Sequence, residues 1–76
     1  MKSETLKHTL QILARVFENS AEKSHIEEFM AKYSGVPWYS GVERSLLTYA
    51  RNNITMERWI ENLINFMKEK NIAYNV

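Results

Sequence analysis

The sequence predicts an all-α fold, a single compact domain of four helices spanning residues 1–76. Apolar side chains recur at spacings of three and four residues, the period of an amphipathic helix. Both glycines and the only proline fall together between the second and third such segments. No stretch alternates apolar and polar residues for long enough to be a strand. The four helices are expected at about 4–18, 25–34, 41–52 and 56–70.

The first two segments carry recognisable starts and stops. Ser3 is a suitable N-cap for the first, whose apolar stripe is Leu6, Leu10, Leu13 and Phe17. The second opens at Ser24–Glu27 with the Ser-x-x-Glu pattern of a capping box. Its stripe is Ile26, Phe29, Met30 and Tyr33. Gly35 is expected to end this helix in the left-handed conformation that glycine adopts without strain.

The third and fourth segments are also delimited by polar residues. Ser40–Glu43 is a second Ser-x-x-Glu box, and Asn52–Asn53 is expected to end the third helix, whose apolar stripe is Val42, Leu46, Tyr49 and Ala50. The fourth is expected to begin at Thr55, with Ile54 and Trp59 paired as a hydrophobic staple. Its apolar face covers roughly 160°, wider than the ~100° of an ordinary surface helix. We therefore expect the fourth helix to form the centre of the domain.

Length and composition limit how such a domain is stabilised. A chain of 76 residues without cysteine has neither a disulfide nor a thiolate metal site to support a small core. Connections of about four to seven residues favour a mainly antiparallel array, and the short third helix leaves room for irregular or orthogonal packing. The lack of cysteine and of a targeting segment predicts a cytoplasmic location. Seven asparagines, six lysines and no aspartate are typical of an AT-rich bacterial or phage genome.

The residue types needed for catalysis or for metal binding do not occur in suitable patterns. His8 and His25, the two histidines, lie on different predicted helices, and neither has a histidine or aspartate one turn away. Glu4 lies one turn before His8, which is typical of a helix-surface pair rather than a metal site. There is no glycine-rich phosphate loop and no nucleophile paired with a base. The sequence therefore predicts a protein that is not an enzyme and that uses no cofactor or metal.

An aromatic pair stands in the turn between the second and third helices. Pro37 holds Val36 in an extended conformation, and Trp38 and Tyr39 follow directly. Two roles stay open for the pair. The side chains can cover a small core, which suits Trp38 better, or they can contact a partner, which suits Tyr39 better.

These features favour a small protein-binding module, such as an adaptor, an inhibitor, or an immunity-type or phage-type regulator. It would act by occupying the surface of another protein. The predicted contact residues are Trp38, Tyr39, Leu47, Arg44 and Arg51. A homodimer is a further prediction, through the wide face of the fourth helix or through the off-axis apolar residues Ile12 and Leu47. No membrane partner is expected.

A DNA-binding regulator is the alternative. The third and fourth helices with their short connection resemble a helix-turn-helix in outline, and Arg44, Arg51 and Arg58 would contact phosphates. Glu57 and Glu61 on the would-be recognition helix would repel those phosphates. The net charge of +1 also provides little field to attract DNA. Both observations argue against nucleic acid as the partner.

Overall fold

A computed structural model describes residues 3–36 and 41–72 of the chain. Within these ranges the protein is all-α, as predicted, and contains no strand. The elements are α1 (Ser3–Ser20), α2 (Lys23–Phe29), the π-helical turn η1 (Met30–Ser34), α3 (Val42–Tyr49) and α4 (Asn53–Glu69). Each predicted helix is therefore present, and the boundaries differ by a few residues.

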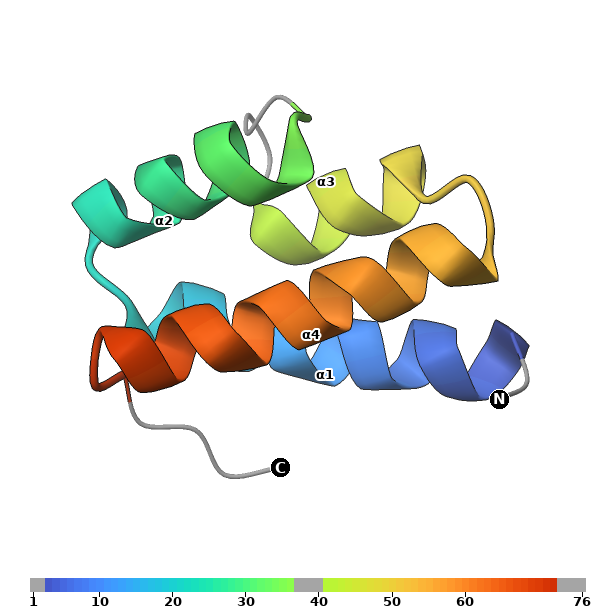
Figure 1. Ribbon diagram of the computed structural model, residues 1–76, viewed down its shortest axis with the longest axis horizontal. Coiled ribbons are helices and arrows are strands. Elements are labelled where there is room, and N and C mark those ends of the chain that lie inside the picture. Colours follow the sequence, from blue (N-terminus) through green and yellow to red (C-terminus); the bar gives the residue numbers. More distant parts are fainter. Residues whose placement is uncertain (1–2, 37–40, 73–76) are drawn as a thin grey trace.

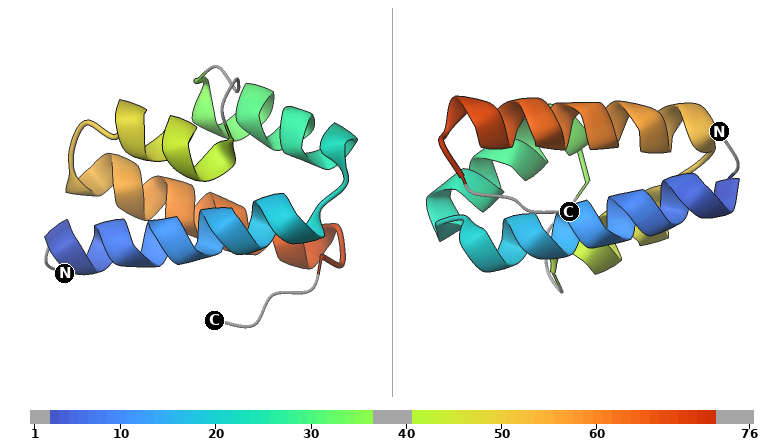
Figure 2. Two further views of the ribbon diagram at one scale, coloured as in Figure 1. Left: turned by 180° about the vertical axis from the view of Figure 1, so that it is seen from behind. Right: turned by 90° about the horizontal axis from the view of Figure 1, so that it is seen from below.

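The helices form two layers. Helices α1 and α4 lie side by side in one layer (Figure 1). The other layer holds α2 with η1, and then α3 further along in the same direction (Figure 1). Figure 2 shows that α1 and α4 run in the same direction. The sequence predicts a mainly antiparallel array. This is correct for α1 with α2 and for α3 with α4, which run in opposite directions in the two layers, and wrong for α1 with α4 (Figure 1, Figure 2). Because α2 and α3 both run back over the first layer, α4 starts again at the end where α1 starts.

The core lies between the two layers. Its fully buried large side chains come from all four helices: Phe17, Phe29, Phe66, Leu6, Leu10, Leu13, Leu46, Leu63, Met67 and Val42. The wide apolar face of α4 is used inside the molecule, because Trp59 is 5% exposed and Ile60 and Ile64 pack half-buried against the core. Helix α1 contacts both α3 and α4, so it shares the central position predicted for α4 alone. Little of the α4 face is thus left for the predicted homodimer.

Three phenylalanines join the helices at one end of the core. Phe17 of α1, Phe29 of α2 and Phe66 of α4 pack edge to face, with ring centroids 5.3, 5.6 and 5.9 Å apart. Tyr33 of η1 and His25 of α2 add their rings at 5.8 and 6.3 Å from Phe66. Such geometry contributes about 0.5–1.5 kcal/mol per pair beyond the burial of area. Phe66 touches the other four rings and is the centre of this cluster.

The second helix ends in a π-helical turn that the sequence does not predict. The backbone amide of Gly35 donates to the carbonyl oxygen of Met30 at 2.9 Å, a bond that spans five residues. Ser34 Oγ donates to the same carbonyl at 2.7 Å and accepts from the amide of Val36 at 3.3 Å. Gly35 adopts φ +67°, so the predicted left-handed stop is confirmed. The chain leaves the helix with Val36 directed back towards α3 and α4.

Two predicted caps are wrong. Helix α2 begins at Lys23 with Glu22 in the N-cap position, so Ser24 lies inside the first turn and cannot cap it. Helix α4 begins at Asn53, and Asn52 Oδ1 accepts from the amide of Thr55 at 2.8 Å. Asn52 therefore caps the fourth helix instead of ending the third. Asparagine is as good an N-cap as serine or threonine, and here the earlier of the two competing residues is the cap.

Helix α3 is capped by a side chain from another helix. The carboxylate oxygen Oε2 of Glu18, on α1, accepts from the amide of Val42 at 2.7 Å. Gly41 is the N-cap residue, with φ +117° and no side-chain cap of its own. Ser40, predicted as the cap, lies outside the described residues. The negative carboxylate sits at the positive end of α3, so it both satisfies a free amide and interacts favourably with the helix dipole.

Ser45 on α3 is buried to 2% exposure, and its hydroxyl has no hydrogen-bond partner among the described residues. Replacement of Ser45 by alanine should therefore stabilise the protein by about 0.5–2 kcal/mol, because an unsatisfied polar group is removed and alanine favours the helix. Thermal unfolding measures this, with Ser24→Ala, an exposed helical serine, as the matched control. A Ser45→Ala protein no more stable than this control would show that the hydroxyl is satisfied.

Candidate partner-binding site

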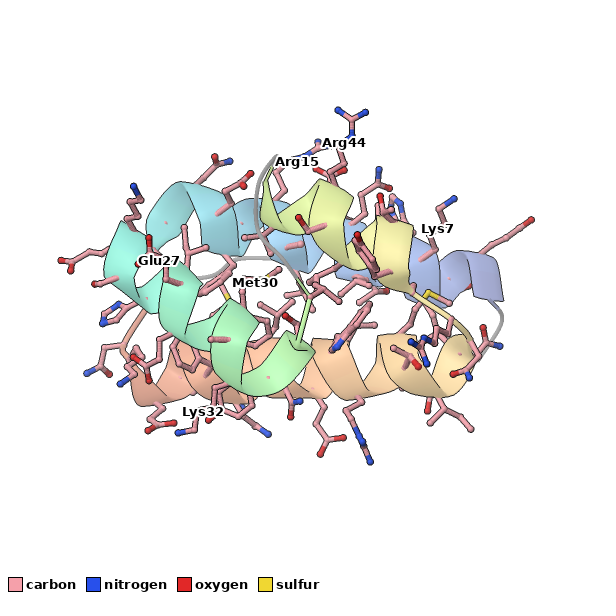
Figure 3. All side chains as sticks on the ribbon, turned by 90° about the horizontal axis from the view of Figure 1, so that it is seen from above. Lys7, Arg15, Glu27, Met30, Lys32 and Arg44 are labelled. Atoms are coloured by element: carbon pink, nitrogen blue, oxygen red, sulfur yellow. The ribbon has the colours of Figure 1, made fainter. Side chains whose placement is uncertain are left out.

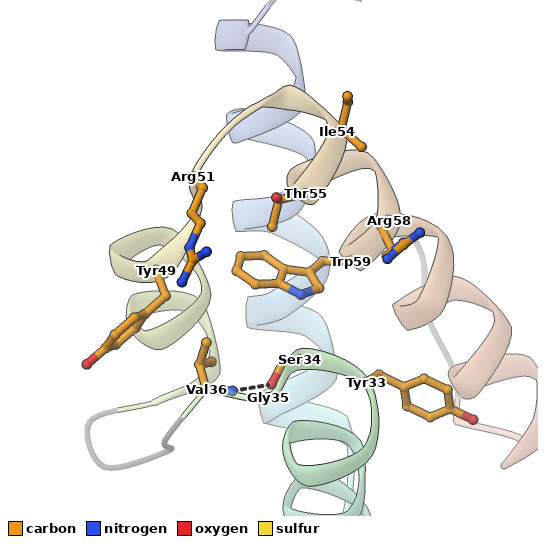
Figure 4. A pocket seen from close by; sticks show the side chains of 10 residues that line it. All are labelled: Tyr33, Ser34, Gly35, Val36, Tyr49, Arg51, Ile54, Thr55, Arg58 and Trp59. Carbon is orange, nitrogen blue, oxygen red and sulfur yellow. Dashed lines mark hydrogen bonds between the residues drawn. The ribbon is translucent and has the colours of Figure 1, made fainter.

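A hollow of about 390 Å³ opens between the end of η1, the end of α3 and the start of α4 (Figure 4). We call it the arginine hollow. Its lining residues are Tyr33, Ser34, Gly35, Val36, Tyr49, Arg51, Ile54, Thr55, Arg58 and Trp59. The π-turn and the Asn52 cap shape its two ends, since the first directs Val36 inward and the second starts α4 early enough to place Ile54 in its first turn.

The hollow has an apolar base and an apolar rim. Trp59 is almost fully buried and forms part of the base, with the half-buried Val36 beside it. Tyr49 is 41% exposed and Ile54 is 73% exposed at the mouth. An isoleucine so exposed beside a hollow adds apolar surface that a partner can bury. Tyrosine, tryptophan and arginine are the residue types that dominate binding energy at protein interfaces.

The charge lining this hollow is all of one sign. Arg51 and Arg58 lie on either side of the Trp59 ring (Figure 4), and no lining residue is acidic. In the part of the chain that the structure describes, neither arginine forms an ion pair, and the pairs present are Arg15 with Glu43 and Lys70 with Glu28. The hollow therefore presents two positive charges, and no carboxylate lines it or forms an ion pair with either arginine among the described residues.

The structure separates the residues that the sequence assigns to one binding surface. Arg51 lines the arginine hollow, whereas Arg44 lines a second hollow together with Glu18 and Glu43. Leu47 lines that second hollow and also a third one, which it shares with Arg51. Leu47 is half-buried and packs against the core, so it is less exposed than its off-axis position predicts. Figure 3 shows Arg44 beside Arg15 at the edge where α3 covers α1. Trp38 and Tyr39 lie outside the described residues.

The three arginines assigned to the DNA-binding alternative are divided in the same way. Arg51 and Arg58 share one hollow and Arg44 lines another. Glu43 also lines the hollow of Arg44, and its carboxylate is bound to Arg15. The three arginines therefore do not form one continuous surface for a phosphate backbone.

An ion pair ties α3 to α1 beside the second hollow. Arg15 donates from Nε to Glu43 Oε2 and from Nη2 to Oε1, both at 3.2 Å. The bond from Arg15, followed by a smaller contribution from Gln11, lowers the pKa of the Glu43 carboxyl below its ordinary value, against the opposing effect of burial. The charged form of Glu43 is thus favoured in the folded protein.

Acidification should therefore remove part of the stability that Glu43 supplies. A lowered folded pKa gives stability that is complete above the unfolded value of about 4.3 and is lost as the pH falls through the folded value. The melting temperature of wild type should exceed that of Glu43→Gln at pH 7, and the gap should close in acid. Glu61→Gln, at an exposed site on α4, is the control. A gap that is constant with pH would contradict the pairing.

Several residues of the arginine hollow cannot be recognised from the sequence pattern. The pattern places Tyr49 in the buried stripe of the third helix and pairs Ile54 with Trp59 as a staple. Helix α3 ends at Tyr49, so the side chain faces outward at the last turn. The exposure of Ile54 could have been predicted from helical geometry. Ile54 is two residues before the buried Met56, so its side chain lies about 200° around α4 from that of Met56 and away from the apolar stripe.

Comparison with known proteins assigns no family, because no family model, curated protein or solved structure matches the chain. Across residues 3–36 and 41–72 no three histidine, glutamate or other ligand side chains gather where they could hold a metal ion. None of the described helices is long and apolar enough to cross a membrane. Function is therefore inferred from the arginine hollow itself.

Proposed function

We propose that the protein is a small, non-enzymatic protein-binding module that acts by occupying a partner's surface, and that its contact site is the arginine hollow. The observation that carries the proposal is that exposed Ile54 and Tyr49 line one hollow together with two arginines and a buried tryptophan. A concave, mostly apolar site with a few polar groups is the usual form of a binding pocket. Its residue composition is that of an interface hot spot.

The mechanism is steric, with orientation set by charge. A partner segment buries an apolar side chain against Trp59 and Ile54, and Arg51 and Arg58 fix its position. Trp38 and Tyr39, which the sequence predicts as partner contacts, lie outside the described residues and stay a prediction. An adaptor, an inhibitor and an immunity-type or phage-type regulator would all use this one mechanism. We place the protein in the cytoplasm, in keeping with its lack of cysteine.

Selection from a random peptide library displayed on phage tests this function directly. The purified protein should enrich peptides that bind wild type and lose binding to the double variant Ile54→Ala/Arg58→Ala. Both side chains are exposed, so the variant should fold as wild type does. Ile12→Ala/Arg44→Ala is the matched control, since it removes one isoleucine and one exposed arginine elsewhere.

Each outcome of the selection bears on the proposal. Enriched peptides that bind the control and not the hollow variant support a module acting through this site. If no peptide is enriched over bare support, the proposed function is wrong. If the control variant loses binding and the hollow variant retains it, the contact site is the second hollow or another face, and the assignment to the arginine hollow is wrong.

A further inference from the structure

We infer that the arginine hollow takes an acidic protein segment in which an apolar side chain stands between carboxylates. This deepens the proposed function and rests on it. Neither the apolar base of the hollow nor the overall charge of the chain specifies this chemistry by itself. It is carried by two guanidinium groups on either side of an indole ring, with no ion pair to either among the described residues (Figure 4).

The charge of the hollow favours an anionic group supplied by a partner. Arg51 and Arg58 line the same hollow, so their positive charges repel each other wherever solvent does not screen them. No acidic side chain lines the hollow: Glu18 and Glu43 line the second hollow, and Glu28 pairs with Lys70. Glu57 and Glu61 are exposed on α4 and form no ion pair with either arginine among the described residues. The first turn of α4, which lines the hollow, adds the positive end of a helix dipole. A partner carboxylate would offset all three contributions.

The shape of the hollow favours an apolar side chain of the partner between those carboxylates. The Trp59 ring lies between the two arginines at the base of the hollow. Val36 supplies aliphatic surface on the α3 side of the hollow, and Ile54 supplies it at the mouth (Figure 4). A carboxylate over the indole face would be repelled by the electron-rich ring, whereas an aliphatic or aromatic side chain is stabilised there by burial of its apolar surface. The favoured order is therefore acidic, apolar, acidic.

A protein segment fits this arrangement better than a nucleic acid. Glu57 and Glu61 are exposed on α4 near Arg58 in the sequence, and they would repel a phosphate backbone that extended along the helix. A short peptide places its charges only where the arginines are. Arginine also binds a carboxylate with two parallel hydrogen bonds, which gives orientation as well as energy.

Synthetic peptides test the inference. The probes are glycine–serine peptides with one leucine flanked by two glutamates at spacings of one to three residues, labelled with a fluorophore and titrated by anisotropy. The best spacing should bind at least about tenfold more tightly than its glutamine analogue and than its leucine-to-serine analogue. Arg51→Gln/Arg58→Gln should abolish the difference between glutamate and glutamine. Lys23→Gln/Arg44→Gln also removes two positive charges, from exposed sites outside the arginine hollow, and should keep the difference.

The outcomes separate this inference from the function on which it rests. Equal binding of the glutamate and glutamine peptides, or no binding at any spacing, overturns the inference. If the phage library nevertheless yields neutral or basic peptides that need Ile54 and Arg58, the protein-binding function stands without it. A duplex oligonucleotide that competes with the glutamate peptide and binds more tightly would also overturn the inference, in favour of a phosphate backbone.

Discussion

Replacement of Phe66 by alanine should remove about half of the free energy of unfolding. Phe66 is fully buried and packs against rings from α1, α2 and η1. Its truncation therefore leaves a cavity bordered by all of these elements. Truncation of a buried phenylalanine costs about 3–5 kcal/mol. At the usual 0.05–0.15 kcal/mol per residue, a domain of this length is stable by about 4–11 kcal/mol.

Urea denaturation followed by far-ultraviolet circular dichroism measures the Phe66 effect. Ile54→Ala is the control, because it removes an apolar side chain from the same helix where that side chain is 73% exposed. The control should change stability by less than about 0.5 kcal/mol. Similar midpoints for the two variants would mean that the aromatic cluster does not hold the layers together.

Replacement of Gly41 by alanine should have the second largest effect, a loss of about 2–4 kcal/mol. At φ +117° only glycine avoids strain, which costs about 1–3 kcal/mol for other residues. An added Cβ would also lie 2.8 Å from Glu18 Oε2. The carboxylate would have to move, and its bond to the amide of Val42 would be lost, at a further cost of about 1 kcal/mol.

A second glycine and a glutamate variant separate the two causes. Gly35→Ala also places alanine at positive φ, but its Cβ would meet nothing within 4 Å, so it should lose less than Gly41→Ala. Glu18→Ala should lose the cap alone. Gly41→Ala is also made in the Glu18→Ala background, where the cap is already absent. If it then lowers the free energy of unfolding by no more than Gly35→Ala does in wild type, backbone strain and the lost cap account for the whole effect. Equal stability of Gly41→Ala and wild type in thermal unfolding would contradict both.

The helices can be predicted from the sequence because their apolar periodicity reports burial directly. Gly35 is predictable as a stop for a local reason, its tolerance of positive φ, and the structure agrees. The caps are less predictable. Polar residues that suit an N-cap occur several times within one turn, and tertiary packing decides between them. Asn52 and Thr55 compete in this way, and the side chain of Asn52 bonds the amide of Thr55.

The candidate site can be predicted only in part. Arg51 and Arg58 stand out in the sequence together as phosphate contacts of the DNA-binding alternative, but only Arg51 is also assigned to the protein-binding surface. The early start of α4 at Asn53 places both in one hollow. The Glu18 cap of α3 joins residues 24 positions apart, a distance at which local patterns carry no information. The parallel arrangement of α1 and α4 likewise follows from packing between layers rather than from connection lengths.

The most direct test of the central claim, that the arginine hollow is the contact site, is a nuclear magnetic resonance titration. Labelled protein is titrated with the tightest peptide from the phage selection, and the amide shifts are followed. The largest changes should fall on Gly35, Val36, Arg51 and Trp59, while Lys23 on α2 stays unchanged. Changes centred on Arg44 and Leu47, or on the exposed face of α1, with the hollow unaffected, would contradict it.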